Sequence, residues 1–294
     1  MIYFKFEMVM NMENFEGIEE KFIKINEINL HVMVIGAGEP LILLHGFPDF
    51  WFGWKNVINE LKNDFTLIIP DMRGYNKSDK PAGVQNYDID ILVSDIKALC
   101  EYFKFEKINI AGHDWGGIVA WVFAEQYPSL LDKLIILNAP HPKIFHETII
   151  NDKKQRRASS YVFQFQSEGG ERFLLDNDYQ VLKLTVFGMV RNKNALTEKD
   201  KELYFKAWAQ SNAIISGVNY YKAFAKGHGS SGIIKVPTLV IWGMKDIYLL
   251  PIQLENLPKY VNDLKIIKSE TASHWIMHDD PALVIKEIRK FIKK

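Results

Sequence analysis

Apolar and polar positions along the 294-residue chain form short strand-like runs separated by helix-compatible stretches. Residues 22–26 and 30–35 alternate between apolar and polar, which is typical of strands with one buried face. Runs richer in apolar residues, most of them typical of strands buried on both faces, lie at 41–44, 65–70, 108–111, 134–137, 238–242 and 264–268. Strands that alternate with helices predict an α/β fold with a mostly parallel, doubly wound sheet.

One long stretch interrupts this rhythm. Residues 138–232 are basic, aromatic and helix-compatible, and they contain no buried-strand run. We therefore expect a core made of residues 17–137 and 233–294, with 138–232 inserted as a helical lid over the C-terminal edge of the sheet, where such folds place their sites. Residues 1–16 carry no signal-peptide cleavage site and are expected to form a dispensable N-terminal extension.

Composition narrows the range of partners and compartments. Lys plus Arg and Asp plus Glu both number 36, so nothing points to nucleic acid or to an anionic membrane surface. The sequence has no apolar run long enough for a membrane span. The single cysteine, Cys100, cannot form an internal disulfide, which fits a reducing compartment. These features predict a cytoplasmic protein, and they leave open whether it is a monomer or a homodimer.

The first candidate for chemistry lies between the strand run 108–111 and a helix-compatible run that begins at Trp115. The segment Gly112-His-Asp-Trp-Gly116 has small residues two positions before and two positions after Asp114. A sharp strand-to-helix turn strains the backbone of its central residue and requires such small neighbours. This is the context of a nucleophile elbow, with Asp114 in place of the usual Ser. From this motif alone, an ordinary Gly-rich turn remains an equal alternative.

A base and an orienting acid would have to follow the nucleophile along the chain. Asp246 lies just past the strand run 238–242, and His274 lies just past the run 264–268. Both side chains should therefore meet at the C-terminal edge of the same sheet. The order nucleophile, acid, His is the order that this kind of elbow uses. We predict Asp114, Asp246 and His274 as the catalytic triad.

Three other histidines are weaker candidates. His278 would rival His274 by residue type, but it precedes two polar aspartates and is expected to be solvated. His31, within an alternating strand, and His113, beside the nucleophile, are expected to be structural.

An ester intermediate also needs hydrogen-bond donors for its developing oxyanion. The backbone N–H of Trp115 follows the nucleophile directly, and that of Phe47 lies in the turn His45-Gly-Phe-Pro48. We predict these two groups as the oxyanion hole; one such donor is worth about 3 kcal/mol. His45 is expected to support this loop and to transfer no proton.

Taken together, these pieces resemble the epoxide hydrolase-like group of the α/β-hydrolase superfamily, over essentially all of residues 17–294. The matching segments are 45–48, 71–75 with Ser78 and Pro81, 112–117, Asp246 with Pro251, and 274–275 with Asp279 and Pro281. Asn76 stands where a Gly is usual, and Asn also tolerates left-handed backbone angles. Some members carry the acid after the strand that precedes the lid. Asn138 and Ala139 occupy that place here, which favours Asp246 as the acid.

The resemblance also implies residues in the lid and around the substrate. Two lid tyrosines of the family grip the epoxide oxygen, and their contexts match Tyr161 and Tyr221, with Tyr220 as the alternative for the second. The residues expected to contact the substrate are His45, Pro48, Phe163 and Trp208.

The function implied is hydrolysis of a small apolar epoxide by water to a vicinal diol, through a covalent ester on Asp114 and with no cofactor or metal. A haloalkane or haloacid dehalogenase, which uses the same nucleophile, is the alternative. Phe47 stands where haloalkane enzymes usually have Asn, and Trp115 stands where the fluoroacetate type has Arg. A ligand-binding receptor on this fold is disfavoured by the intact triad, although fold alone would not exclude it.

Overall fold

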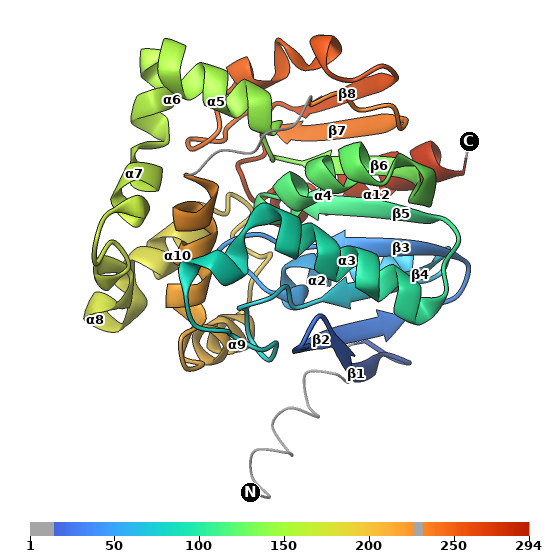
Figure 1. Cartoon of the computed structure of the whole chain (residues 1–294), viewed down its shortest axis with the longest axis horizontal. Helices are drawn as coiled ribbons and strands as arrows, with labels where there is room; N and C mark the ends of the chain where they lie inside the picture. Colours follow the sequence, from blue (N-terminus) through green and yellow to red (C-terminus); the bar gives the residue numbers. More distant parts are fainter. Residues whose placement is uncertain (1–14, 226–231, 294) are drawn as a thin grey trace, which may run out of the picture.

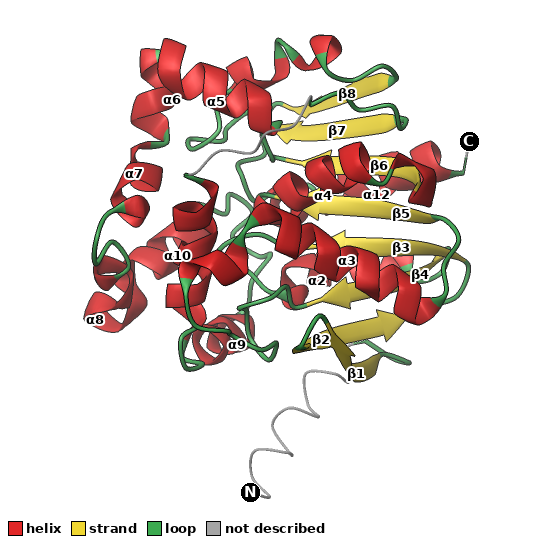
Figure 2. Ribbon diagram, viewed as in Figure 1, coloured by secondary structure: helices red, strands yellow, loops and turns green. Residues whose placement is uncertain are grey.

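The computed structural model describes residues 15–225 and 232–293, and its strands form one sheet (Figures 1 and 2). Among these residues, eight strands are ordered β1-β2-β4-β3-β5-β6-β7-β8 across the sheet. Their bounds are β1 Glu19–Ile25, β2 Ile28–Ile35, β3 Glu39–Leu44, β4 Phe65–Pro70, β5 Ile108–His113, β6 Leu131–Leu137, β7 Thr238–Gly243 and β8 Leu264–Ser269. Each coincides with one of the predicted runs.

The sheet is mostly parallel. The hairpin β1–β2 and the pair β2–β4 are antiparallel, and every other neighbouring pair is parallel. The residues of β5, for example, are all buried, as the apolar run predicts for a central parallel strand. The predicted α/β fold is confirmed.

Helices cover both faces of this sheet. α3 (Ile89–Phe103) packs with α4 (Trp115–Gln126) on one face, and α2 (Lys55–Leu61) packs with α12 (Pro281–Ile292) on the other (Figure 1). Asp88 and Asp280 cap α3 and α12 by accepting hydrogen bonds from backbone N–H groups of the first turn. The shorter elements are α11 (Ile276–Asp279) and the 3-10 turns η1 Trp51–Trp54, η2 Val84–Tyr87, η3 Pro128–Leu130, η5 Pro251–Leu254 and η6 Leu257–Lys259.

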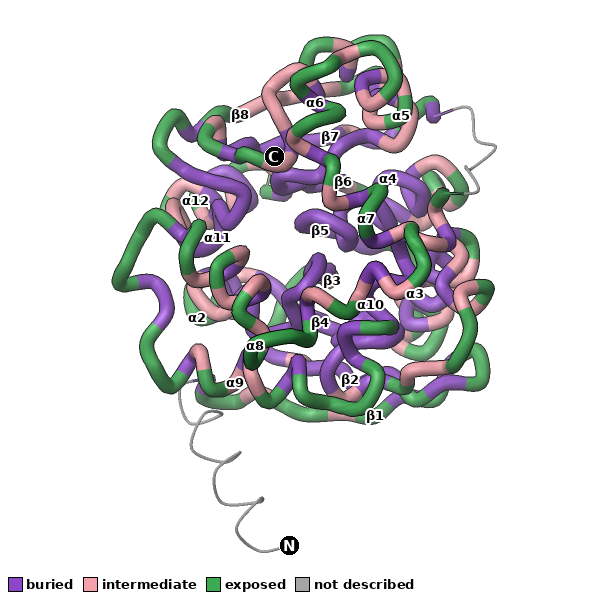
Figure 3. Tube along the Cα trace, turned by 90° about the vertical axis from the view of Figure 1, so that its left-hand side faces the viewer, coloured by how far each residue is buried: buried purple, intermediate pink, exposed green. Residues whose placement is uncertain are grey.

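The helices between β6 and β7, which we call the lid helices, gather at the sheet edge toward which the parallel strands point (Figure 1). They are α5 Pro142–Asn151, α6 Lys153–Ala158, α7 Ser160–Gln166, α8 Arg172–Lys183, α9 Glu198–Trp208 and α10 Ala213–Phe224, with a π-helical turn, η4 Leu184–Gly188, after α8. Seen from this side, strands of the sheet lie buried at the centre behind lid helices with exposed outer stretches (Figure 3). Within the described residues, no helix is long and apolar enough to cross a membrane.

The start of the chain differs from expectation in one respect. Most of the predicted extension 1–16 lies outside the described residues. Phe15, however, is buried and packs edge-on against Trp51 and Phe52. Burial of an aromatic side chain ties this point to the core, so the folded chain begins before residue 17.

Candidate active site

The turn between β5 and α4 has the strained geometry that its sequence predicts. Asp114 adopts φ 49° and ψ −120°, a conformation that few non-glycine residues take. A Cβ atom on Gly112 would lie 2.5 Å from the carbonyl oxygen of Gly116, and one on Gly116 would lie 2.3 Å from that of Leu44. Any larger residue at either position would therefore force the turn open. The glycines thus allow the backbone to present Asp114 at the edge of the sheet.

Two backbone N–H groups hold the Asp114 carboxylate. Oδ1 accepts a hydrogen bond of 2.8 Å from the N–H of Phe47, and the N–H of Trp115 also donates to this carboxylate. Burial raises the pKa of Asp114, and the charge of His274 and these two N–H groups counteract it only in part. The groups predicted as oxyanion donors therefore already point at the carboxylate whose ester they would stabilise.

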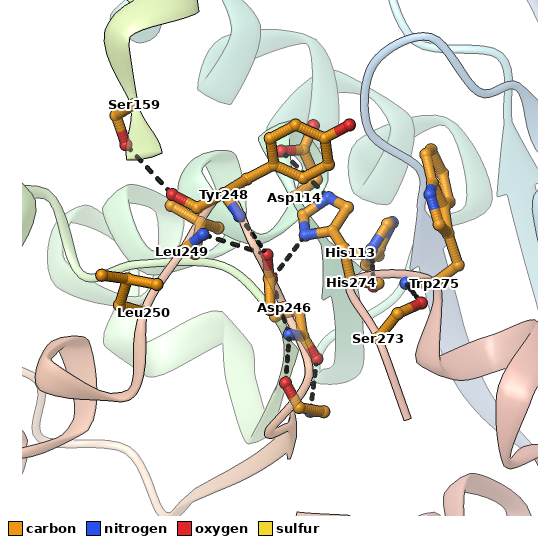
Figure 4. Close-up of polar contacts among 12 residues, drawn as sticks. His113, Asp114, Ser159, Asp246, Tyr248, Leu249, Leu250, Ser273, His274 and Trp275 are labelled. Atoms are coloured by element: carbon orange, nitrogen blue, oxygen red, sulfur yellow. Dashed lines mark hydrogen bonds and ion pairs between the residues drawn. The ribbon is translucent and has the colours of Figure 1, made fainter. Parts of the chain in front are cut away.

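His274 and Asp246 meet beside this carboxylate (Figure 4). His274 Nδ1 lies 2.7 Å from Asp246 Oδ2, and its Nε2 lies 3.6 Å from Asp114 Oδ2. Asp246 Oδ1 accepts the backbone N–H groups of Tyr248 and Leu249 at 2.8 and 3.0 Å. Burial alone would lower the pKa of His274, but the charge and hydrogen bond of Asp246 outweigh it and raise the pKa. The structure thus brings the three predicted triad residues into one cluster.

Asn138 makes a contact that sequence reasoning did not find. Its side-chain amide donates to Asp246 Oδ2 at 2.8 Å and accepts the N–H of Gly243 at 2.8 Å. From the sequence, Asn138 indicates only that no second acid follows the strand before the lid. The available signal was its place at the end of the strand next to β7, which puts an amide beside the Asp246 loop.

A cavity of about 260 Å³ opens in front of Asp114 and His274. Tyr161 from α7 and Tyr221 from α10 both line it. Burial, reinforced by the charge of Asp114, raises the pKa of both hydroxyls well above the usual value, so both keep their protons. Tyr220 does not line the cavity, because its hydroxyl is buried and donates to the carbonyl of Arg73 at 2.6 Å. Of the two alternatives, Tyr221 is the one at the site.

The indole of Trp115 has a role that the sequence did not suggest. Its ring packs edge-on against the ring of Tyr221, with centroids 4.9 Å apart, and it slightly counteracts the effect of burial on the pKa of the Tyr221 hydroxyl. Trp115 therefore contributes its backbone N–H to Asp114 and its side chain to the orientation of Tyr221.

Phe163 was expected to contact the substrate, and the structure corrects this expectation. Its side chain is 49% exposed on the outside of α7. Residues two apart on a helix face different sides, whereas residues four apart share a face. Tyr161 and Phe165 therefore both reach the cavity, and Phe163 points away from it.

The other three residues expected to contact the substrate also lie outside this cavity. His45 is fully buried, and its Nε2 accepts the N–H of Met72 at 2.9 Å, so it supports its loop. The Trp208 indole donates to the carbonyl of Pro48 at 2.7 Å, and both residues line a separate space of about 10 Å³. These side chains support the loop that carries Phe47, and the cavity is lined instead by apolar residues of α8.

The expectation that His278 is solvated is also corrected. The side chain is fully buried, and burial lowers its pKa to about 4. Its ring nitrogens contact Asn56 Nδ2 at 2.9 Å and the Tyr204 hydroxyl at 3.4 Å. His113, expected to be structural, is buried, with Nε2 2.9 Å from the carbonyl oxygen of His274. Among the residues that the structure describes, no group of three or more side chains is arranged to hold a metal ion.

Comparisons with known proteins agree with this geometry. Residues 39–281 match the family model described as the alpha/beta hydrolase fold. The chain is 37% identical to epoxide hydrolase 1 of Caenorhabditis elegans, covering 95% of this chain and 71% of the relative. It is 35% identical to epoxide hydrolase 4 of Homo sapiens, covering 93% and 78%. An epoxide hydrolase of Bacillus megaterium, solved in complex with an inhibitor, superposes with a TM-score of 0.88 at 32% identity, covering 93% of this chain and 100% of that one.

Proposed function

The chain belongs to the α/β hydrolase fold family and is an epoxide hydrolase, and on this premise we propose how its residues divide the work. The observation that carries the proposal is the position of Asp114. Its carboxylate is held by two backbone N–H groups, lies 3.6 Å from the His274 ring, and faces a cavity lined by two protonated tyrosines.

In the first step, Asp114 attacks a ring carbon of the epoxide. A bond forms between a carboxylate oxygen and that carbon, and the ring C–O bond breaks. Tyr161 and Tyr221 donate hydrogen bonds to the departing oxygen, and one of them gives up its proton to it. The product is a hydroxyalkyl ester of Asp114. Because the alkoxide is a poor leaving group, donors that stabilise its growing charge lower the barrier.

In the second step, His274 takes a proton from water, and the resulting hydroxide attacks the ester carbonyl. The N–H groups of Phe47 and Trp115 stabilise the oxyanion of the tetrahedral intermediate. Its collapse releases the diol and restores the Asp114 carboxylate. The proton on His274 returns through solvent to the tyrosine that lost its own. Asp246 keeps His274 in the tautomer whose Nε2 accepts a proton, and it stabilises the imidazolium that forms.

The division of the chain follows from these roles. We propose residues 138–232 as a lid that supplies Tyr161 and Tyr221, and residues 17–137 and 233–294 as the core that supplies the triad. We also propose that the protein lies in the cytoplasm, because its single cysteine, Cys100, is a free thiol and a chain without disulfides suits a reducing compartment.

A dehalogenase is the rival activity, because it would use the same aspartate. Its halide needs an N–H donor in the cavity wall, and Trp115 is the obvious candidate. Here the indole packs edge-on against the Tyr221 ring, and Trp115 is not among the residues that line the larger cavity. That cavity presents the hydroxyls of Tyr161 and Tyr221, which favours epoxide opening, in which both are donors to oxygen.

The test is a turnover screen of the wild-type protein with styrene oxide and fatty-acid epoxides against haloalkanes, with diol and free halide measured in parallel. We expect diol formation from at least one epoxide. Halide release without epoxide turnover would establish the dehalogenase instead.

A further inference from the structure

The site has two chambers of unequal size. The larger has a volume of about 260 Å³, and a second, of about 30 Å³, adjoins it at the nucleophile. Three residues line both chambers: Asp114, Tyr161 and Tyr221. These are the nucleophile and the two hydroxyls assigned to the epoxide oxygen. The epoxide ring therefore lies at the junction, and substituents on its two carbons extend into different chambers.

The two volumes set what each chamber can hold. An engineered apolar cavity of about 150 Å³ binds benzene, whereas a single water needs about 10–15 Å³ measured in this way. The larger chamber thus accepts an aryl-sized group, and Phe165 and Phe173 give it aromatic walls. It must also admit the hydrolytic water, because His274 lines this chamber and is not among the residues that line the smaller one. The smaller chamber accepts hydrogen or a methyl group.

The walls of the smaller chamber resist expansion. Ile118 belongs to α4 directly behind the elbow and is only 7% exposed. Phe224, at the end of α10, packs edge-on against Trp115 with ring centroids 5.5 Å apart. Because Trp115 also holds the nucleophile and Tyr221, moving this wall would disturb the site. Inserting bulk into such packing costs about 1–3 kcal/mol or more.

We propose that this enzyme acts on monosubstituted, terminal epoxides that carry one apolar substituent of aryl size, and that Phe224 excludes epoxides with a bulky group on the second carbon. The inference rests on the proposed function, since it takes Tyr161 and Tyr221 as the groups that bind the epoxide oxygen. The substituent enters the chamber lined by Phe165 and Phe173, and the unsubstituted carbon faces Phe224.

The experiment compares kcat/KM for styrene oxide and trans-stilbene oxide, which differ by a second phenyl group on the other ring carbon. In the wild type, stilbene oxide should be poorer by at least about 10²-fold, the upper range of discrimination by one misfitting group. Phe224→Ala enlarges the smaller chamber and should raise the stilbene-to-styrene ratio roughly 10-fold. Phe173→Ala is the matched control, because it enlarges the other chamber and should leave the ratio unchanged. Intrinsic reactivity cancels when each variant's ratio is divided by that of the wild type.

Thermal unfolding checks that both variants fold, and Phe224→Leu replaces Phe224→Ala if the latter does not. Comparable wild-type turnover of both epoxides would overturn the inference while leaving the epoxide hydrolase assignment intact. An equal rise of the ratio in both variants, or a rise in neither, would remove Phe224 as the determinant. Failure to turn over either epoxide, with halide released from haloalkanes, would overturn the proposed function itself.

Discussion

In the part of the chain that the structure describes, two buried histidines each have Nδ1 within hydrogen-bonding distance of an aspartate, and one of these histidines, His274, faces the cavity. His274 Nδ1 is 2.7 Å from Asp246, and His31 Nδ1 is 2.5 Å from Asp71. Both histidines are buried, and in both the neighbouring carboxylates overcome the effect of burial and raise the pKa. The two sites are therefore alike in having an aspartate partner, in the burial of the histidine and in the direction in which its pKa is shifted.

The two histidines differ in the surroundings of their second ring nitrogen, Nε2. His31 Nε2 lies 2.8 Å from Glu20 Oε1, so carboxylates hold both nitrogens and favour the imidazolium. His274 Nε2 instead lies 3.6 Å from Asp114, on the wall of the cavity. A His–Asp pair thus becomes a candidate base only where its other nitrogen can reach a water and a reactive carboxylate. The His31 pair serves structure, because Asp71 also accepts the N–H of Trp51 at 2.9 Å.

Replacing each histidine should give the largest contrast. His274→Gln removes the base for ester hydrolysis, so steady turnover should fall by up to about 10⁴-fold while an ester on Asp114 accumulates. Intact mass spectrometry after mixing with an epoxide should show protein heavier by one substrate mass. His31→Gln, the matched control, should show no adduct. A His274→Gln protein that binds epoxide and forms no adduct would contradict Asp114 as the nucleophile.

The lid hydroxyls are the second difference between the two pairs, since the cavity beside His274 contains Tyr161 and Tyr221. Tyr161→Phe and Tyr221→Phe should each slow ester formation by about 10²–10³-fold, by analogy with the loss of an oxyanion donor. The double variant should be nearly inactive. Stopped-flow or quenched single-turnover assays separate this step from hydrolysis, which should keep its rate. Ester formation at the wild-type rate in the double variant would refute the role of these tyrosines.

The sheet was predictable because its signal is local. The run Ile108–Ala111, apolar apart from Asn109, was enough to locate β5, and the glycines around Asp114 were enough to predict the turn that follows. The order of Asp114, Asp246 and His274 along the chain then predicted that they would meet, because parallel strands end at one edge.

What the sequence could not supply depends on contacts between distant segments. The burial of His278 depends on Asn56 and Tyr204, which are far from it along the chain. The outward direction of Phe163 depends on the rotational setting of α7, which aromatic composition does not reveal. The contact between the Trp115 indole and Tyr221 likewise requires the lid to be in place. The secondary structure could therefore be predicted from the sequence, whereas the directions of the side chains in the lid could not.

Asp246→Asn should produce a smaller but more diagnostic effect. The variant keeps the imidazole, so hydrolysis of the ester should slow by about 10²-fold, the lower range for loss of proton-transfer assistance. The charge of Asp246 is the main influence that raises the pKa of His274. Without it the pKa falls, and because hydrolysis needs the neutral ring, its decline on acidification should move to lower pH. The pH profile of single-turnover ester hydrolysis measures this shift. An unchanged profile would mean that Asp246 does not act on His274 electrostatically.

The smallest effect on turnover belongs to His31→Gln, where the change should appear in stability instead. Carboxylates of Asp71 and Glu20 raise the folded-state pKa of His31 above its unfolded value of about 6.5. Its charge therefore stabilises the fold fully below that unfolded value, and the contribution is lost as pH rises through the higher folded-state pKa.

At pH 6, His31→Gln should lower the free energy of unfolding by about 3 kcal/mol, the lower end of the cost of breaking a buried pair. Urea unfolding at pH 6 and pH 9 should show the deficit shrinking at the higher pH, while turnover stays within about twofold of the wild type. A deficit that grows with pH, or a loss of turnover as deep as in His274→Gln, would erase the distinction between the two pairs.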